Sequence, residues 1–207
     1  MLHSFAKARQ VIVVELQGHG HTADINRPET FEQDADDVAA LLKYLKIGKA
    51  DFFGFSNGGD TTMQIAIRHP NVVRKIVIGS GLYKREGMYP LFWKSMNHAT
   101  LKGMPQQLQD EYKKVAPNPD DLPEMSKKDL NRMLTFKDWR DEDLKSITAP
   151  ALIIISDADV VRPEHAVEMF RLMPHAKLSI LPGGHGAYIG EVITGMEHSK
   201  IPDLTVS

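Results

Sequence analysis

The stretch that decides the fold is "ADFFGFSNGGDTT", residues 50–62, in which one serine stands between an apolar run and a cluster of glycine and asparagine. The apolar run at residues 50–55 has the length and aromatic content of a buried strand. A helix is expected from Asn57 onward, and Pro70 ends it because proline cannot continue a helix. We therefore expect Ser56 to lie at a sharp turn between a strand and a helix.

The five residues "GFSNG" at positions 54–58 match the pattern G-x-S-x-G at the place where a nucleophile elbow must lie, after a strand and at the start of a helix. A turn this tight needs positions nearly bare of side chain, which explains Gly54, Gly58 and Gly59. The turn would lift the serine hydroxyl above the carboxyl ends of the strands, where open α/β sheets bind ligands. The first N–H groups of the helix would face the same point, so the backbone of Asn57 is the expected oxyanion donor.

A serine hydroxyl is a weak nucleophile unless a base activates it, and the base in turn needs a group that orients it. "ALIIISDADVVRPEH" places Asp157 and Asp159 directly after an expected strand, and "LSILPGGHGAY" places His185 after the next one. The chain order serine, aspartate, histidine is the order expected for a G-x-S-x-G turn on this architecture. We predict Ser56 as nucleophile and His185 as general base, with either aspartate orienting the imidazole.

Strands and helices alternate along much of the remaining chain. Further strands are expected at residues 11–16, 71–80, 149–156 and 176–183. Helices are expected from the Thr30 and Gln33 capping box to about residue 46, with Gly48 after the end, and again from Pro163. Parallel strands need crossovers long enough to hold a helix, so the fold class is α/β, with a mostly parallel sheet covered by helices on both faces.

Residues 82–148 break this alternation and are rich in methionine and aromatic residues. Between two strands of one sheet, such a stretch predicts an inserted helical cap. The expected organisation is a core of residues 1–81 and 149–207 with a cap of residues 82–148. Flexible thioethers and aromatic rings suit the roof of an apolar pocket, although each of them can equally pack the cap against its base.

On these residues the chain resembles the α/β-hydrolase superfamily, and more narrowly its serine esterases, lactonases and cofactor-free haloperoxidase-like members. "VIVVELQGHGHT" is similar to the strand and glycine segment before the elbow, "GFSNGG" to the elbow, "SDADVVRPEHA" to the acid loop and "LPGGHGAY" to the histidine loop. The resemblance implies a carboxylic ester hydrolase without a cofactor. It also implies that Asp159, rather than Asp157, is the acid.

The same resemblance implies segments that this sequence lacks. Members of the superfamily carry further strands before the one matched by residues 11–16, a loop that donates a second oxyanion N–H, and a closing helix after residue 207. We expect the natural protein to be longer at both ends, with roughly 40 to 60 more residues at the front. One of the missing strands would lie inside the sheet, next to residues 50–55.

Composition excludes several classes of function. A formal net charge of -2 and scattered lysines provide no basic surface for nucleic acid, and the apolar runs are too short to cross a membrane. The chain has no cysteine and no pattern of a signal peptide, so a cytoplasmic protein is expected. "GHGHTAD" places His19, His21 and Asp24 together, but Thr22 and Ala23 are not ligands, no obvious further ligands complete a zinc site, and we expect no metal there.

The leading hypothesis is a serine hydrolase that cleaves a small-molecule carboxylic ester or lactone through an acyl-enzyme on Ser56, His185 and Asp159. One alternative is perhydrolysis or acyl transfer on the same three residues. Another is a noncatalytic ligand-binding protein or an inactive fragment of the same fold, because fold does not determine function. The sequence does not identify the substrate or the oligomeric state, and a homodimer stays open.

Overall fold

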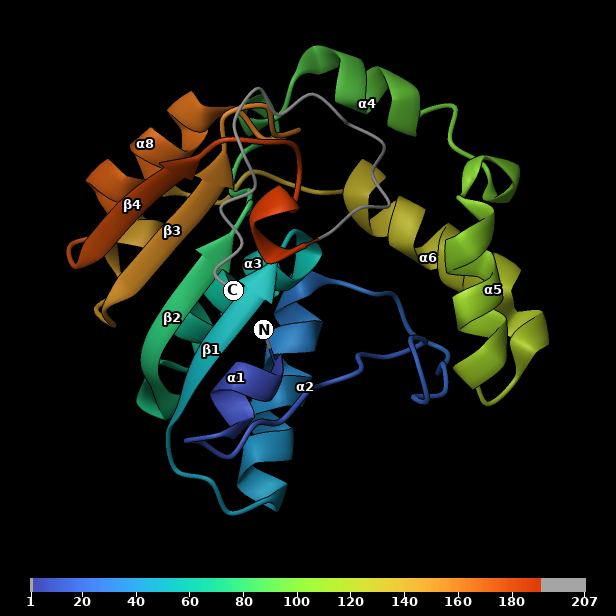
Figure 1. Ribbon diagram of the computed structural model, residues 1–207, viewed down its shortest axis with the longest axis horizontal. Coiled ribbons are helices and arrows are strands. Elements are labelled where there is room, and N and C mark those ends of the chain that lie inside the picture. The colour runs from blue at the N-terminus through green and yellow to red at the C-terminus, as the bar shows by residue number, and fades with distance from the viewer. Residues whose placement is uncertain (1, 191–207) are drawn as a thin grey trace. The chain divides into compact units, whose positions relative to one another are not determined.

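The computed structural model describes residues 2–190. Within them, β1 (Ala50–Phe55), β2 (Val73–Gly79), β3 (Ala151–Ser156) and β4 (Ala176–Leu181) form one four-stranded sheet in the order β1-β2-β3-β4 (Figure 1). Every pairing is parallel, and Ile78 in β2 stands between Gly54 in β1 and Ile153 in β3. The predicted α/β class and the predicted strands at these four places are confirmed.

Helix α3 (Asn57–Arg68) joins β1 to β2, and α8 (Pro163–Leu172) joins β3 to β4. Each packs on the strands that it connects, and Figure 1 shows both on the far side of the sheet. Right-handed crossovers that always step in one direction place their helices on one face. The side chains agree, because Ile76, Ile78 and Ile153 are buried on that face, whereas Phe53, Val77 and Leu152 on the other are exposed or half-buried. The predicted parallel sheet flanked by helices is confirmed, with the two connecting helices α3 and α8 on one face.

Helix α2 (Phe31–Tyr44) packs against α3 through one buried apolar stripe formed by Phe31, Ala35, Val38 and Leu42. Thr30 caps the amino-terminal end, since its side chain accepts a hydrogen bond from the Gln33 N–H at 3.1 Å. The Gln33 side chain bonds Asp37 instead of returning to Thr30, so only one half of the predicted capping box forms.

The carboxyl-terminal end of α2 differs from the prediction. The helix ends at Tyr44, four residues before Gly48, and Lys46 adopts the left-handed conformation with φ 59°. The N–H groups of Lys46 and Ile47 bond back to the last turn. A lysine therefore takes the position that glycine usually occupies after a helix.

The strand predicted at residues 11–16 is absent. This segment has no regular secondary structure, and no strand among residues 2–190 pairs with it. Its apolar side chains are exposed, with Val13 65% accessible. The segment has the β-branched composition of a strand, but a strand forms only when a neighbouring strand pairs with its backbone N–H and C=O groups.

Residues 82–148 are helical, as predicted, through α4 (Pro90–Met96), α5 (Gln106–Val115), α6 (Leu122–Leu134), α7 (Asp141–Lys145) and short 3₁₀ turns at Arg85–Gly87, Leu101–Gly103 and Pro119–Asp121. The division into compact units differs from the predicted core and cap. One unit contains the residues up to Pro28, including α1 (Leu2–Ala6), together with Thr100–Lys128, and the other contains Glu29–Ala99 and the residues from Asp129 onward.

Aromatic packing explains why both ends of the predicted cap belong to the unit of the sheet. Phe136 and Trp139 meet the Phe31 ring edge-on at centroid distances of 6.0 and 6.3 Å. The Trp139 N–H also donates to the Tyr83 carbonyl at 2.9 Å. These residues complete the core around α2.

Inside the first unit, Lys128 bonds the Asp24 carboxylate at 2.6 Å and the Ile25 carbonyl at 2.8 Å. Asp24 therefore has a cation as its direct partner. Across residues 2–190, every helix lacks either the length or the apolar character needed to span a membrane.

Candidate active site

Ser56 lies at the turn between β1 and α3, with φ 54° and ψ −124°. This conformation costs a residue with a side chain about 1 to 3 kcal/mol and persists only where the surroundings enforce it. Two hydrogen bonds do so, because the Ser56 N–H donates to the Gly79 carbonyl at 2.8 Å and the Ser56 carbonyl accepts from the Gly59 N–H at 2.7 Å. The backbone thus forms the sharp strand-to-helix turn that the sequence predicted.

The glycines around the turn are not equivalent. A Cβ atom on Gly54 would lie 1.9 Å from the Gly58 carbonyl oxygen, and one on Gly59 would lie 2.9 Å from the Gly79 carbonyl oxygen. A Cβ atom on Gly58 would meet nothing within 4 Å. Gly54 and Gly59 are required by close backbone approach, whereas the steric reason expected for Gly58 was wrong.

Asp159 and His185 meet beyond the carboxyl ends of β3 and β4. The Asp159 Oδ1 atom lies 2.6 Å from Nδ1 of His185, and the Val161 N–H donates to the same oxygen at 3.2 Å. Both side chains are buried. Burial would raise the pKa of the Asp159 carboxyl, but the hydrogen bonds that it accepts, first of all from His185, hold the pKa below its ordinary value.

The imidazole lies beside the elbow. The rings of Phe55 and His185 are 4.6 Å apart between centroids, and Phe55 directly precedes Ser56. The ring of Tyr188, in the 3₁₀ turn Ala187–Ile189, meets the Phe55 ring edge-on at a centroid distance of 6.1 Å. Ser56, Asp159 and His185 therefore gather at one edge of the sheet although the chain separates the first from the last by more than half its length.

Asp157 has a different partner. Its Oδ1 atom accepts a hydrogen bond from the Gly183 N–H at 2.9 Å, and its side chain is exposed. Of the two aspartates that the sequence offered, Asp159 is the one that contacts His185. Asp157 instead ties the segment before His185 to the end of β3.

Asn57 is the first residue of α3. Its N–H is one of the first-turn groups for which an α-helix provides no internal acceptor, and it lies at the positive end of the helix dipole. This position suits the oxyanion donor predicted from the sequence, and that role stays a prediction.

The family described as alpha/beta hydrolase fold matches residues 1–123, which include the elbow. The chain belongs to the alpha/beta hydrolase family. The turn at Ser56 and the strands β1 and β2 lie within the matched residues.

Three similar proteins illustrate the range of the family. RutD, a candidate carbamate hydrolase of Caulobacter sp. strain K31, is 24% identical over 208 residues, which cover 86% of this chain and 74% of RutD. Human serine hydrolase BPHL is 35% identical over 77 residues, 35% of this chain and only 26% of BPHL. The structure of Est816, described as an N-acyl homoserine lactone degrading enzyme, aligns with TM-score 0.64 and 26% identity over 86% of this chain and 76% of Est816.

The three residues considered as metal ligands from the sequence, His19, His21 and Asp24, each contact a different group within the first unit. His21 Nδ1 contacts the Glu15 carboxylate at 3.0 Å, and Asp24 bonds Lys128. His19 Nδ1 contacts a backbone carbonyl at 2.8 Å.

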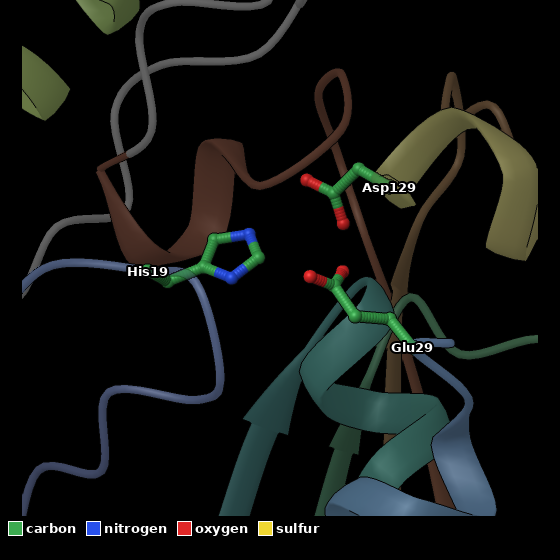
Figure 2. A group of neighbouring side chains, drawn as sticks. All are labelled: His19, Glu29 and Asp129. Carbon is green, nitrogen blue, oxygen red and sulfur yellow. The ribbon is translucent and has the colours of Figure 1, made fainter. Parts of the chain in front are cut away.

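Two carboxylates that sequence reasoning missed lie close together in the second unit. Figure 2 shows Glu29 and Asp129 pointing toward one another, and their nearest oxygens lie within 4.8 Å. Glu29 precedes α2 and Asp129 lies on α6, so one hundred positions separate them and no local pattern could have joined them. A carboxylate pair alone falls short of the three or four ligands of a zinc site.

Proposed function

We propose that this chain is a serine hydrolase that cleaves small carboxylic esters or lactones through an acyl-enzyme on Ser56. The observation that carries the proposal is the Asp159–His185 pair at 2.6 Å, with the imidazole packed on the residue next to Ser56. A buried carboxylate bonded to Nδ1 sets the tautomer of an imidazole and stabilises the positive charge that the imidazole gains as a base.

The first half-reaction forms the acyl-enzyme. Because Nδ1 faces Asp159, Nε2 is the ring nitrogen that takes the proton from the Ser56 hydroxyl as its oxygen attacks the substrate carbonyl carbon. The carbonyl electron pair moves to oxygen, where the Asn57 N–H and the start of α3 stabilise the negative charge. The oxygen re-forms the double bond, and the alcohol leaves with the proton from His185.

The second half-reaction restores the enzyme. Water replaces the departed alcohol, gives a proton to His185, and its oxygen attacks the acyl carbon. Collapse of this second intermediate releases the carboxylic acid and returns the proton to Ser56. Asp159 keeps its negative charge throughout, which agrees with a pKa held below the ordinary value of an aspartate.

The choice of ester or lactone is supported by the relatives. The name of BPHL describes a serine hydrolase, and Est816 is described as degrading a lactone. The name of RutD describes a candidate hydrolase of carbamates, a third class of carbonyl compound. Since these proteins are longer than this chain or match only part of it, the substrate is best found by assay.

The decisive experiment combines covalent labelling with turnover. The chain should react with a fluorophosphonate probe and hydrolyse p-nitrophenyl acetate, and Ser56→Ala should lose both, with a fall in kcat of at least about a thousandfold. Ser146→Ala is the matched control, because this exposed serine bonds only a neighbouring backbone carbonyl at 2.6 Å. Unchanged labelling of Ser56→Ala, or no labelling of the parent chain, would contradict the proposal.

The same acyl-enzyme could be discharged by an alcohol or by peroxide instead of water. Competition between acceptors separates these reactions from hydrolysis. Ester hydrolysis in water with less than a few per cent of product diverted by millimolar alcohol or peroxide supports the hydrolase. A chain that binds ester analogues but never becomes labelled is a noncatalytic binding protein.

A further inference from the structure

Ser80 is a second serine held in an unusual conformation near the proposed site. It follows β2 directly, has φ 50° and is 3% exposed. Its N–H donates to the Ile154 carbonyl in β3 at 2.8 Å, so the backbone is fixed by the neighbouring strand. Sequence analysis did not single out this residue.

The Ser80 hydroxyl reaches the far oxygen of the proposed acid. Ser80 Oγ donates to Asp159 Oδ2 at 2.6 Å, while the other oxygen, Oδ1, faces His185. Ser80 Oγ also lies 2.9 Å from the hydroxyl of Tyr188, which belongs to the 3₁₀ turn Ala187–Ile189 just after His185. A row of hydrogen bonds thus runs from Tyr188 through Ser80 and Asp159 to His185.

The direction of these hydrogen bonds follows from the chemistry of the groups. An ionised carboxylate only accepts, so the single proton of the Ser80 hydroxyl is committed to Asp159. Ser80 Oγ must then accept from Tyr188, whose hydroxyl is the only donor of that pair left. Burial raises the pKa of the Tyr188 hydroxyl, which keeps its proton in place.

Gly79, beside the contact between the Ser80 and Tyr188 hydroxyls, has no side chain. A Cβ atom on Gly79 would lie 2.6 Å from the Tyr188 hydroxyl oxygen, so a side chain there would push the tyrosine away from Ser80. The same residue provides the carbonyl that accepts from the Ser56 N–H. The end of β2 is therefore shaped to hold both the elbow and the tyrosine.

We propose that Ser80 and Tyr188 are positioning residues for the reaction at Ser56. Through two successive hydrogen bonds they hold Asp159 with Oδ1 directed at His185 and favour its ionised form. The inference rests on the proposed hydrolase function and assigns no contact with substrate to either residue. It implies that the position of the base depends on the end of β2 as well as on β3 and β4.

The test uses Ser80→Ala, Ser80→Gly, Tyr188→Phe and the double variant Ser80→Ala/Tyr188→Phe. Loss of the hydroxyl at residue 80 should lower kcat for p-nitrophenyl acetate by about ten- to a hundredfold with KM unchanged, and Tyr188→Phe by about three- to tenfold. Because Tyr188 acts through Ser80, the double variant should be no slower than Ser80→Ala within about twofold.

Two comparisons exclude a general structural effect. Ser80→Gly relaxes the positive φ but also lacks the hydroxyl, so it should be as slow as Ser80→Ala even where it is more stable. Tyr44→Phe, at a residue with 82% of its surface exposed, and Ser146→Ala should keep the parent kcat. In proton NMR spectra, the downfield signal of the His185 Nδ1–H should move or broaden in Ser80→Ala and Tyr188→Phe but not in these controls.

The outcomes separate the two proposals. If the parent chain reacts at Ser56 and both Ser80→Ala and Tyr188→Phe keep kcat within about twofold with an unmoved Nδ1–H signal, the positioning role is wrong and the hydrolase stands. If the parent chain does not react at Ser56, the hydrolase proposal fails and takes the positioning role with it. Should Ser80→Ala not fold, Tyr188→Phe decides alone, since it leaves Ser80 in place.

Discussion

The chain carries one local pattern twice, at residues 11–20 and 50–59, and only the second becomes a strand followed by a structured turn. Both stretches have an apolar run closed by glycines. Every residue of β1 has a partner in β2, whereas no strand within residues 2–190 pairs with residues 11–16. The difference shows that β-propensity is realised by a neighbouring strand and not by the pattern itself.

The glycines in the two stretches also differ in what they are needed for. Gly54 faces backbone atoms of α3 that cannot move away. Gly20 has φ 57°, and the atoms nearest to a Cβ atom on it would be those of the flexible Glu15 side chain. The elbow therefore depends on packing against neighbouring elements, and the first loop depends on local conformation.

The largest effect is expected from Gly54→Ala, which drives a methyl group into the first turn of α3. With the new carbon 1.9 Å from a backbone oxygen, the free energy of unfolding should fall by about 4 kcal/mol, or the chain should not fold. Urea denaturation measures this. Gly48→Ala is the control, because a Cβ atom there meets nothing within 4 Å, and equal losses in the two variants would refute the steric argument.

Truncation of one apolar side chain in β2, the partner of β1, and of one in the unpaired residues 11–16 tests the role of strand pairing. Ile78→Ala in β2, which is fully buried, should cost about 3 kcal/mol. Val13→Ala should change the free energy of unfolding by less than about 0.5 kcal/mol because the side chain is 65% exposed. A loss of similar size at Val13 would mean that residues 11–16 contribute to the folded core.

Acid sensitivity should distinguish the buried Asp159 carboxylate, beyond the end of β3, from the exposed Glu15 carboxylate in the first stretch. The folded-state pKa of Asp159 lies below its unfolded value, so its contribution is present above the unfolded value and is lost as pH falls through the folded one. Asp159→Asn should therefore cost about 2 kcal/mol near neutral pH, and progressively less as pH falls below the unfolded pKa of an aspartate.

Glu15→Gln provides the contrast. It should change the free energy of unfolding less than Asp159→Asn does, because Glu15 is exposed and its contact with His21 is screened by salt. Urea midpoints at neutral and acid pH, in low and high salt, measure both variants. A gap between Asp159→Asn and the parent chain that persists unchanged at low pH would contradict the assignment of the lowered pKa to Asp159.

The smallest effect is expected from relief of backbone strain. Ser56→Gly should stabilise the fold by about 1 kcal/mol while abolishing activity, because glycine tolerates φ 54° and has no hydroxyl. Lys46→Gly, at φ 59°, should stabilise by a similar amount and keep full activity. A less stable Ser56→Gly chain would show that the turn at Ser56 is not strained.

Much of the sheet and of the proposed site could be predicted because the signals are local. A run of apolar residues, a proline and a glycine-bounded serine define β1 and α3, and a strand end shortly before Asp159 or His185 places each of them at the same edge. The order of these residues along the chain then suggested their chemistry.

What could not be predicted depends on distant neighbours. Residues 11–16 carry the pattern of a strand but no information about a partner. Ser80 is a serine at the end of a strand like many others, and only the position of Asp159, 79 residues later, makes its hydroxyl informative. The bare backbone at Gly79 becomes meaningful only once Tyr188 is in place.

The bond from the Gly183 N–H to Asp157 has a consequence for engineering this protein. Asp157, after β3, bonds Gly183 before His185, and Ser80, after β2, bonds Tyr188 after His185. The loop that carries the imidazole is therefore held by residues at the ends of β2 and β3 as well as by β4. If that loop alone were grafted onto a related scaffold, it would lose its hydrogen bonds to Ser80 and Asp157. The segments that follow β2, β3 and β4 should therefore be transferred together in any such graft.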